Sequence, residues 1–286
     1  ALSSRRPLYR HLRDAYYLSE VEPLLPTPMF NIVNGGKHAD SGLDVQEFMV
    51  VPVGASSFGE ALRMGVEVYQ ALKKLLALRG LSTAVGDEGG FAPRVGSHAE
   101  ALDLILEAVS KSGFEGKVAL AIDAAASEFF KDGRYVFERK ELSSEELIER
   151  YAQWARSYPI ISFEDPLAED DWPAWEEITA RLGGKARIVG DDLFVTNLSR
   201  LERGIREGSA NAILIKLNQI GTVTETVRAV LAARNAGFSS IISHRSGETE
   251  DPYIADLSAA LGAGAIKTGA PCRSERLAKY NQLLRI

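Results

Sequence analysis

The sequence contains a single cysteine, no long apolar run and no cluster of basic residues. One cysteine, Cys272, excludes an internal disulfide, and we expect a reducing compartment such as the cytoplasm. No stretch approaches the roughly 20 apolar residues that cross a bilayer, and no signal-peptide core follows Ala1, so we expect no membrane association. A net charge of −6 without a Lys/Arg cluster argues against a nucleic-acid partner.

The composition is that of a folded protein with a large core. The chain is 45% hydrophobic and 25% charged over 286 residues, which excludes a disordered chain. Its length would allow two domains, but α/β barrels reach this size as one domain. The pattern of elements therefore decides the domain count.

Short aliphatic runs dominate the second half of the chain, and each run ends in a charged or hydrogen-bonding residue. We expect them to be buried parallel strands, because such strands are apolar on both faces. Helical patterns lie between them, with helix-start signals at Ser143 and Thr222. The runs are residues 118–123, 160–164, 187–191, 212–216, 239–244 and 265–267.

Two earlier runs, residues 30–34 and 45–51, raise the expected strand count to eight. Too few residues join them for a helical crossover, so they should pair antiparallel. Helices are expected at residues 58–78 and 99–112. We therefore predict an α/β fold, an eight-stranded TIM-like β/α barrel of order ββαα(βα)6. A doubly wound open sheet is the alternative, but no glycine-rich phosphate fingerprint follows a strand.

Carboxylates end three successive predicted strands. Asp123, Glu164 and Asp191 should meet at one face of the barrel, because each strand-helix-strand unit returns the chain to the same end. An all-oxygen cluster suits a hard divalent cation, and Mg²⁺ is the expected one. A single acid of this kind is more often a surface residue or a cap, and three together reverse that expectation.

Lys216 and Lys267 end two later strands at the same face. A strand-end lysine is usually a salt-bridge partner, and that alternative stays open. Beside a divalent cation and a second ammonium, however, the pKa of a lysine falls and it can serve as a general base. Abstraction of a proton from carbon is therefore a candidate chemistry.

Further polar residues are expected near the same mouth. Glu88 lies in a loop with three glycines, residues 86–90, that could present a carboxylate, although an ordinary acidic turn is the alternative. His38 and Glu47 border the first two strands, where either could be a hydrogen-bonded core residue. Arg245 and Ser246 directly follow the predicted strand ending at residue 244, and their guanidinium and hydroxyl groups could form a phosphate-binding site.

Two other histidines, His11 and His98, have no comparable setting, so we expect them at the surface.

Several segments of the chain resemble the enolase family. The resemblance extends from residues 7–10 to residues 279–285. The matching segments are FNIVNGGKHAD (30–40), DVQEFM (44–49), GLSTAVGDEGGFAP (80–93), VGDD (189–192), LIKLNQIG (214–221) and SHRSGETED (243–251).

This resemblance implies a Mg²⁺-dependent enzyme that dehydrates 2-phosphoglycerate to phosphoenolpyruvate in glycolysis and gluconeogenesis. It implies the following roles: Asp123, Glu164 and Asp191 as metal ligands; Lys216 as the base at C2; Glu88, with Glu47, as the acid at the C3 hydroxyl; Lys267 at the substrate carboxylate; Arg245 and Ser246 at the phosphate; and His38 and His244 as pocket residues.

The resemblance also carries expectations about organisation. Members of the family carry a smaller α/β domain before the barrel, so residues 1–25 are expected to be a linker or the remnant of such a domain, and residues 26–286 the catalytic barrel. A homodimer or larger homo-oligomer is expected as well. Two alternatives stay open, another lyase of the enolase superfamily and a barrel that binds without catalysis.

Overall fold

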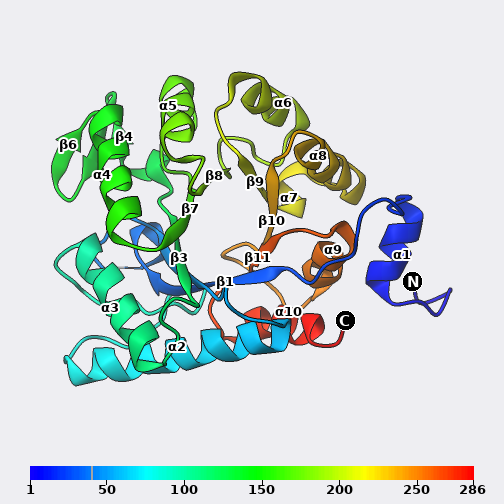
Figure 1. Ribbon diagram of the computed structural model, residues 1–286, viewed down its shortest axis with the longest axis horizontal. Coiled ribbons are helices and arrows are strands. Elements are labelled where there is room, and N and C mark those ends of the chain that lie inside the picture. The colour runs from blue at the N-terminus through cyan, green and yellow to red at the C-terminus, as the bar shows by residue number, and fades with distance from the viewer. Residues whose placement is uncertain (40) are drawn as a thin grey trace.

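The computed structural model describes residues 1–39 and 41–286, and only the backbone of His38. Its centre is a closed barrel in the order β1-β11-β10-β9-β8-β7-β3-β2, which confirms the predicted fold (Figure 1). The barrel strands are β1 (Thr27–Asn34), β2 (Glu47–Val51), β3 (Ala119–Asp123), β7 (Ile160–Glu164), β8 (Arg187–Gly190), β9 (Ala212–Ile215), β10 (Ser239–Ser243) and β11 (Ala265–Lys267).

Strand β2 runs against both of its neighbours, and the remaining barrel pairs are parallel. Glu47, the first residue of β2, lies opposite Asn34 and Asp123, the last residues of β1 and β3. The reversal therefore places Glu47 at the barrel end where the parallel strands finish.

Helices form a ring around the strands (Figure 1). Ser57, Ser97, Ser143 and Thr222 each accept a hydrogen bond from the backbone N–H three residues later and act as N-caps, which includes the start signals expected at Ser143 and Thr222. The helices are α1 (Leu8–Ala15), α2 (Phe58–Leu78), α3 (His98–Lys111), α4 (Ser144–Ser157), α5 (Trp172–Leu182), α6 (Leu198–Glu207), α7 (Leu217–Ile220), α8 (Val223–Asn235), α9 (Tyr253–Leu261) and α10 (Ser274–Leu283).

Two hydrophobic clusters stabilise this arrangement. The larger one fills the space between strands and helices. The smaller one fills the barrel interior and contains Met29, Met49, Val189, Leu214 and Ile241, each at most 1% exposed. The interior of the barrel is therefore packed with side chains below its mouth.

A small three-stranded sheet was not predicted. Strands β4 (Phe130–Lys131), β5 (Arg134–Phe137) and β6 (Lys140–Leu142) lie between β3 and α4, after the 3-10 turn η2 (Ala126–Phe129). They lie within the 41 positions from Asp123 to Glu164, an interval longer than each of the four that follow it between predicted strand ends.

The burial of His98 contradicts the sequence prediction. His98 is 1% exposed, and its Nε2 accepts hydrogen bonds from the backbone N–H groups of Asp44 (2.9 Å) and Val45 (3.2 Å). Its Nδ1 lies 3.0 Å from Glu138 Oε1, and its ring stacks on Phe137 at 4.5 Å. The surface expectation was wrong because the β4–β6 sheet covers this residue.

The first 25 residues include a helix packed on the barrel. In α1, the Tyr9 backbone N–H donates to Asp256 Oδ1 of α9 at 3.1 Å, and Arg13 donates to the carbonyl of Ala260 at 3.3 Å. His11, on the same helix, is partly exposed. The expected domain division at residue 25 stays a prediction. In the described part of the chain, no helix is long and apolar enough to cross a membrane.

Candidate active site

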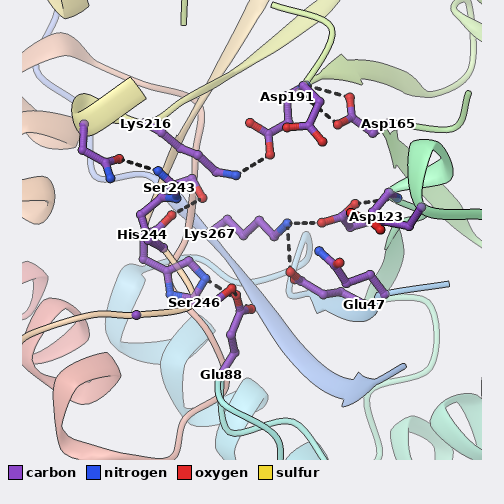
Figure 2. A pocket seen from close by; sticks show the side chains of 17 residues that line it. Glu47, Glu88, Asp123, Asp165, Asp191, Lys216, Ser243, His244, Ser246 and Lys267 are labelled. Atoms are coloured by element: carbon purple, nitrogen blue, oxygen red, sulfur yellow. Dashed lines mark hydrogen bonds and ion pairs between the residues drawn. The ribbon is translucent and has the colours of Figure 1, made fainter. Parts of the chain in front are cut away.

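A cavity of about 410 Å³ opens at the barrel end where the parallel strands finish (Figure 2). Glu164 is buried at the end of β7 beside it, at 1% exposure. Nearly all of the site residues predicted from the sequence line this cavity, namely Glu47, Glu88, Asp123, Asp191, Lys216, His244, Arg245, Ser246 and Lys267.

Lys267 lies at the centre of a buried charge cluster. Its Nζ reaches across the mouth to Asp123 Oδ2 at 2.8 Å and Glu47 Oε1 at 3.2 Å (Figure 2). It also lies 2.8 Å from Glu164 Oε1. Burial lowers the pKa of Lys267, but the three carboxylates outweigh burial and raise the pKa well above its usual value. Lys267 is therefore a fixed cation.

Lys216 forms an ion pair with Asp191, and this is its one ion pair in the part of the chain that the structure describes. Its backbone N–H donates to Thr196 Oγ1 at 2.9 Å, which holds the residue after β9 in place. Burial lowers the pKa of Lys216, and Asp191 and Glu164 raise it further than burial and Lys267 lower it. We expected a lowered pKa for Lys216 beside a bound cation. The protein groups alone raise this pKa, so a lowered value would require the cation.

The carboxylates of the cluster differ in their affinity for protons. Burial raises the pKa of Glu47 well above its usual value, and the neighbouring Glu88 raises it further. Burial also raises the pKa of Glu164, with Asp123 as the next cause. Burial raises the pKa of Asp123 as well, but its contact with Lys267 outweighs burial and lowers it. Burial therefore favours the protonated forms of Glu47 and Glu164, whereas Lys267 favours the charged form of Asp123.

The donor set fits a hard divalent cation. Glu164 Oε2 is buried and has no hydrogen-bond partner among the described residues, and a bound cation is one group that would satisfy it. Asp165, Asp191 and Asp192 also place carboxylate oxygens within 4.8 Å of one another. Both oxygens of Asp165 already accept backbone N–H groups, from Asp191 at 2.9 Å and Asp192 at 2.8 Å. Asp165 thus holds the β8 end in position for its neighbours.

The loop at residues 86–90 presents Glu88 to the cavity. The Glu88 carbonyl accepts the N–H of Ala270 at 2.9 Å, and Tyr69 Oη donates to the Gly89 carbonyl at 2.7 Å. Gly89 has φ +85°, a left-handed conformation that suits glycine. Asn31 Nδ2 donates to Glu88 Oε2 at 3.0 Å, so the carboxylate is oriented from β1.

Three residues following β10 face Glu88 and the cavity. His244 is 2% exposed, and its Nε2 lies 3.3 Å from Glu88 Oε2. Ser246 Oγ lies 3.3 Å from Glu88 Oε1. Arg245 is exposed, and its Nη1 donates to Asn218 Oδ1 at 2.9 Å. The side chain of His38 lies outside the described part of the structure, and its predicted role is not placed here.

Comparison with known proteins identifies the family. Residues 22–286 match the family described as "Enolase, C-terminal TIM barrel domain". The chain belongs to the enolase family. It is 58% identical to the enolase of Elusimicrobium minutum over all 286 residues, which cover 67% of that protein. It is 59% identical to the enolase of Acidothermus cellulolyticus over 99% of the chain and 66% of that protein. It thus spans about two thirds of the length of these enolases.

Three residues near the enolase-type site were not singled out from the sequence. Asp165 and Asp192 each directly follow a predicted metal ligand in the sequence. The adjacent acids at residues 164–165 and 191–192 could therefore have indicated them. Arg276 of α10 gave no such signal, because the groups that it contacts lie far away along the chain.

Proposed function

We propose that this barrel carries out the enolase reaction, the reversible loss of water from 2-phosphoglycerate that gives phosphoenolpyruvate. One observation carries the proposal. A single cavity brings two lysines, the carboxylates Glu47 and Glu88, and an acidic cluster suited to a cation into contact distance. Family membership supports the same reaction.

Lys216 is the proposed base at C2. It lines the cavity with 16% of its side chain exposed, and Asp191 is its ion-pair partner among the described residues. Because Asp191 raises the pKa of Lys216, the ammonium loses its proton and becomes a free base only when Asp191 withdraws from it. Binding of a cation by Asp191 would weaken its ion pair with Lys216 in this way.

Glu88 is the proposed acid at the C3 hydroxyl, together with Glu47. The two carboxyls line the cavity, and Glu88 raises the pKa of Glu47 in addition to burial. A carboxyl that keeps its proton near neutral pH can deliver it to a departing hydroxide. The hydroxide then leaves as water.

Charge stabilisation falls to Lys267 and to the proposed metal ligands. We propose that Asp123, Glu164 and Asp191 hold Mg²⁺, and the unpartnered Glu164 Oε2 and the all-oxygen donors support this assignment. When bound, Mg²⁺ would stabilise the negative charge that develops on the substrate carboxylate as the C2 proton leaves. Lys267 offers a fixed positive charge for the same carboxylate.

Substrate orientation is the proposed role of the remaining residues. Arg245 and Ser246 border the cavity after β10, where a guanidinium and a hydroxyl suit a phosphate. His244 lines the same wall, and the resemblance assigns His38 to the pocket. The phosphate would then sit opposite the acidic cluster.

Two measurements on the purified chain test these roles. The first is phosphoenolpyruvate formation from 2-phosphoglycerate with Mg²⁺. The second is exchange of the C2 hydrogen for deuterium in D₂O, followed by NMR. Lys216→Ala should abolish both, since no base remains. Glu88→Gln should abolish dehydration and retain exchange, since only the acid is lost.

Several outcomes would contradict the proposal. Full dehydration by Lys216→Ala would remove the base assignment. Turnover of another carboxylate substrate in a panel, without turnover of 2-phosphoglycerate, would favour a different lyase of the superfamily. No Mg²⁺ binding in calorimetry and no turnover would favour a binding role.

The setting of this activity is also a proposal. We propose a role in glycolysis and gluconeogenesis, in the cytoplasm, as a homodimer or larger homo-oligomer. Family membership supports this setting. Light scattering across a concentration series tests the oligomeric state, and a constant monomer mass would contradict it.

A further inference from the structure

Arg276 is a buried cation outside the set of proposed catalytic residues. It lies on α10, and its side chain is 1% exposed. Its Nη1 lies 2.6 Å from His244 Nδ1 and donates to the Arg245 carbonyl at 2.7 Å. Its Nη2 donates to the carbonyls of Asp87 at 3.1 Å and Ser246 at 2.6 Å. One guanidinium thus connects the loop of Glu88 to the loop that follows β10.

The contact between Arg276 and His244 determines which ring nitrogen carries the proton. A guanidinium has only donors and stays protonated in proteins. His244 Nδ1 must therefore be the acceptor, and in the neutral ring the single proton resides on Nε2. A charged ring would place a second N–H against the guanidinium at 2.6 Å.

The surroundings of His244 keep the ring neutral. Burial lowers the pKa of His244, and the nearby charges of Arg276 and Lys267 lower it further. Glu88 is the opposing influence, and together these effects leave the pKa below its usual value. The ring is thus a neutral Nε2–H donor near neutral pH.

That donor faces one oxygen of the proposed acid. His244 Nε2 lies 3.3 Å from Glu88 Oε2, and Asn31 Nδ2 donates to the same oxygen at 3.0 Å. The contact of His244 with Glu88 falls short of hydrogen-bond geometry, so Nε2 has no hydrogen-bond partner among the described residues. The tautomer of His244 therefore decides whether the ring presents an N–H or a lone pair to the Glu88 carboxylate.

We propose that Arg276 is a positioning residue that fixes the tautomer of His244 and thereby presents an N–H, rather than a lone pair, to the proposed acid Glu88. The last step of this inference rests on the proposed function of Glu88. The tautomer itself does not, so it can be measured without substrate.

The structure supplies an internal reference for that measurement. His98 accepts two backbone N–H groups at Nε2 and contacts Glu138 through Nδ1, so it is the opposite tautomer. NMR of ¹⁵N-histidine-labelled protein separates the two forms by the shifts of their ring nitrogens. His244→Gln and His98→Gln would assign the signals.

Three variants test the role of Arg276. Arg276→Met removes all donors, and Arg276→Lys keeps a charge but loses the planar fork. Lys279→Met is the matched control, because Lys279 is an equally buried cation of α10 that contacts the carbonyls of Thr249 and Glu275. We expect both Arg276 variants to lose the Nε2–H signature of His244, and Lys279→Met to keep it. The His98 signals should not change.

Activity provides the second measurement. We expect kcat for 2-phosphoglycerate to fall by about 100-fold in Arg276→Met, since a misplacement of about 1 Å costs this much. A wild-type His244 with its proton on Nδ1, or with both nitrogens protonated, would overturn the proposal. So would an Arg276→Met protein with unchanged His244 shifts. If Arg276→Met does not fold, the wild-type spectrum and Arg276→Lys still decide the tautomer. If the wild type has no turnover, the proposed function fails while the tautomer result stands.

Discussion

Replacement of Lys267 should expose the energetics of the buried charge cluster most directly. Lys267→Met keeps the length and apolar stem of the side chain and removes the ammonium that contacts Asp123, Glu164 and Glu47 at 2.8 to 3.2 Å. All three carboxylates are at most 4% exposed, so water cannot replace the lost charge. Removing one partner of a buried pair costs about 3–5 kcal/mol. We expect Lys267→Met to lose at least about 3 kcal/mol of unfolding free energy, because three carboxylates share this cation.

The loss should be visible in thermal and urea unfolding. For a chain of this size, about 3 kcal/mol corresponds to a fall in Tm on the order of 10 °C. The exposed lysine Lys73 provides the matched control, since Lys73→Met should change stability by no more than about 0.5 kcal/mol. An unchanged urea midpoint for Lys267→Met at pH 7 would refute the reasoning.

The pH dependence adds a second test of the same cluster. Burial raises the pKa values of Glu47 and Glu164 above the usual 4.5, and loss of Lys267 removes an influence that lowers both. The folded variant then binds more protons than its unfolded state, so its stability rises as the pH falls toward about 5. The difference between variant and wild type should therefore shrink from pH 7 to pH 5. A constant difference would mean that the penalty is not electrostatic.

Three further perturbations give distinct outcomes. Burial is the chief cause of the lowered pKa of His98 in the folded state, so the stability that neutral His98 contributes is complete above about pH 6.5 and is lost as the pH falls through the folded pKa. Between pH 7.5 and pH 5.5, the urea midpoint should therefore fall more in wild type than in His98→Asn. Equal falls in the two proteins would contradict this. Gly65→Ala should cost about 1–3 kcal/mol, because a Cβ would lie 2.3 Å from the Phe30 ring, whereas Gly59→Ala in the same helix meets nothing closer than 3.8 Å and should not destabilise. Mg²⁺ at 100-fold its Kd should stabilise wild type by about 2.7 kcal/mol and Asp191→Asn by much less. The measurement is Tm as a function of Mg²⁺ concentration, and equal Tm shifts in the two proteins would argue against Asp191 as a ligand.

The barrel could be predicted from the sequence because each of its strands is a short apolar run with a polar end. The observed bounds of β7, Ile160–Glu164, and of α2, Phe58–Leu78, coincide with the predicted ones. The small sheet β4–β6 escaped prediction because its strands have only two to four residues, and β4 and β6 contain one apolar residue each. The burial of His98 was missed for the same reason, since it depends on Glu138 and Phe137 in that sheet.

The candidate site could be predicted as a set of residues, and its pairings could not. Strand-end positions place Asp123, Asp191, Lys216 and Lys267 at one mouth, but they give no distances between side chains. Which lysine contacts which acid depends on strand tilt and on burial. Arg276 was beyond prediction because its partners lie between 30 and 189 positions away along the chain.

The structure distinguishes the two lysines by their contacts, whereas their strand-end positions alone give both the same setting. Lys267 contacts three buried carboxylates, and its side chain is 3% exposed. Loss of its proton would leave those acids without a counter-charge, so it cannot serve as a base without destabilising the cluster. Lys216 pairs with one carboxylate among the described residues, that of Asp191 at the edge of the cavity, and 16% of its side chain is exposed. Displacing one carboxylate is enough to lower its pKa. The geometry therefore favours Lys216 as the residue that exchanges a proton with substrate and Lys267 as the cation that stays charged throughout.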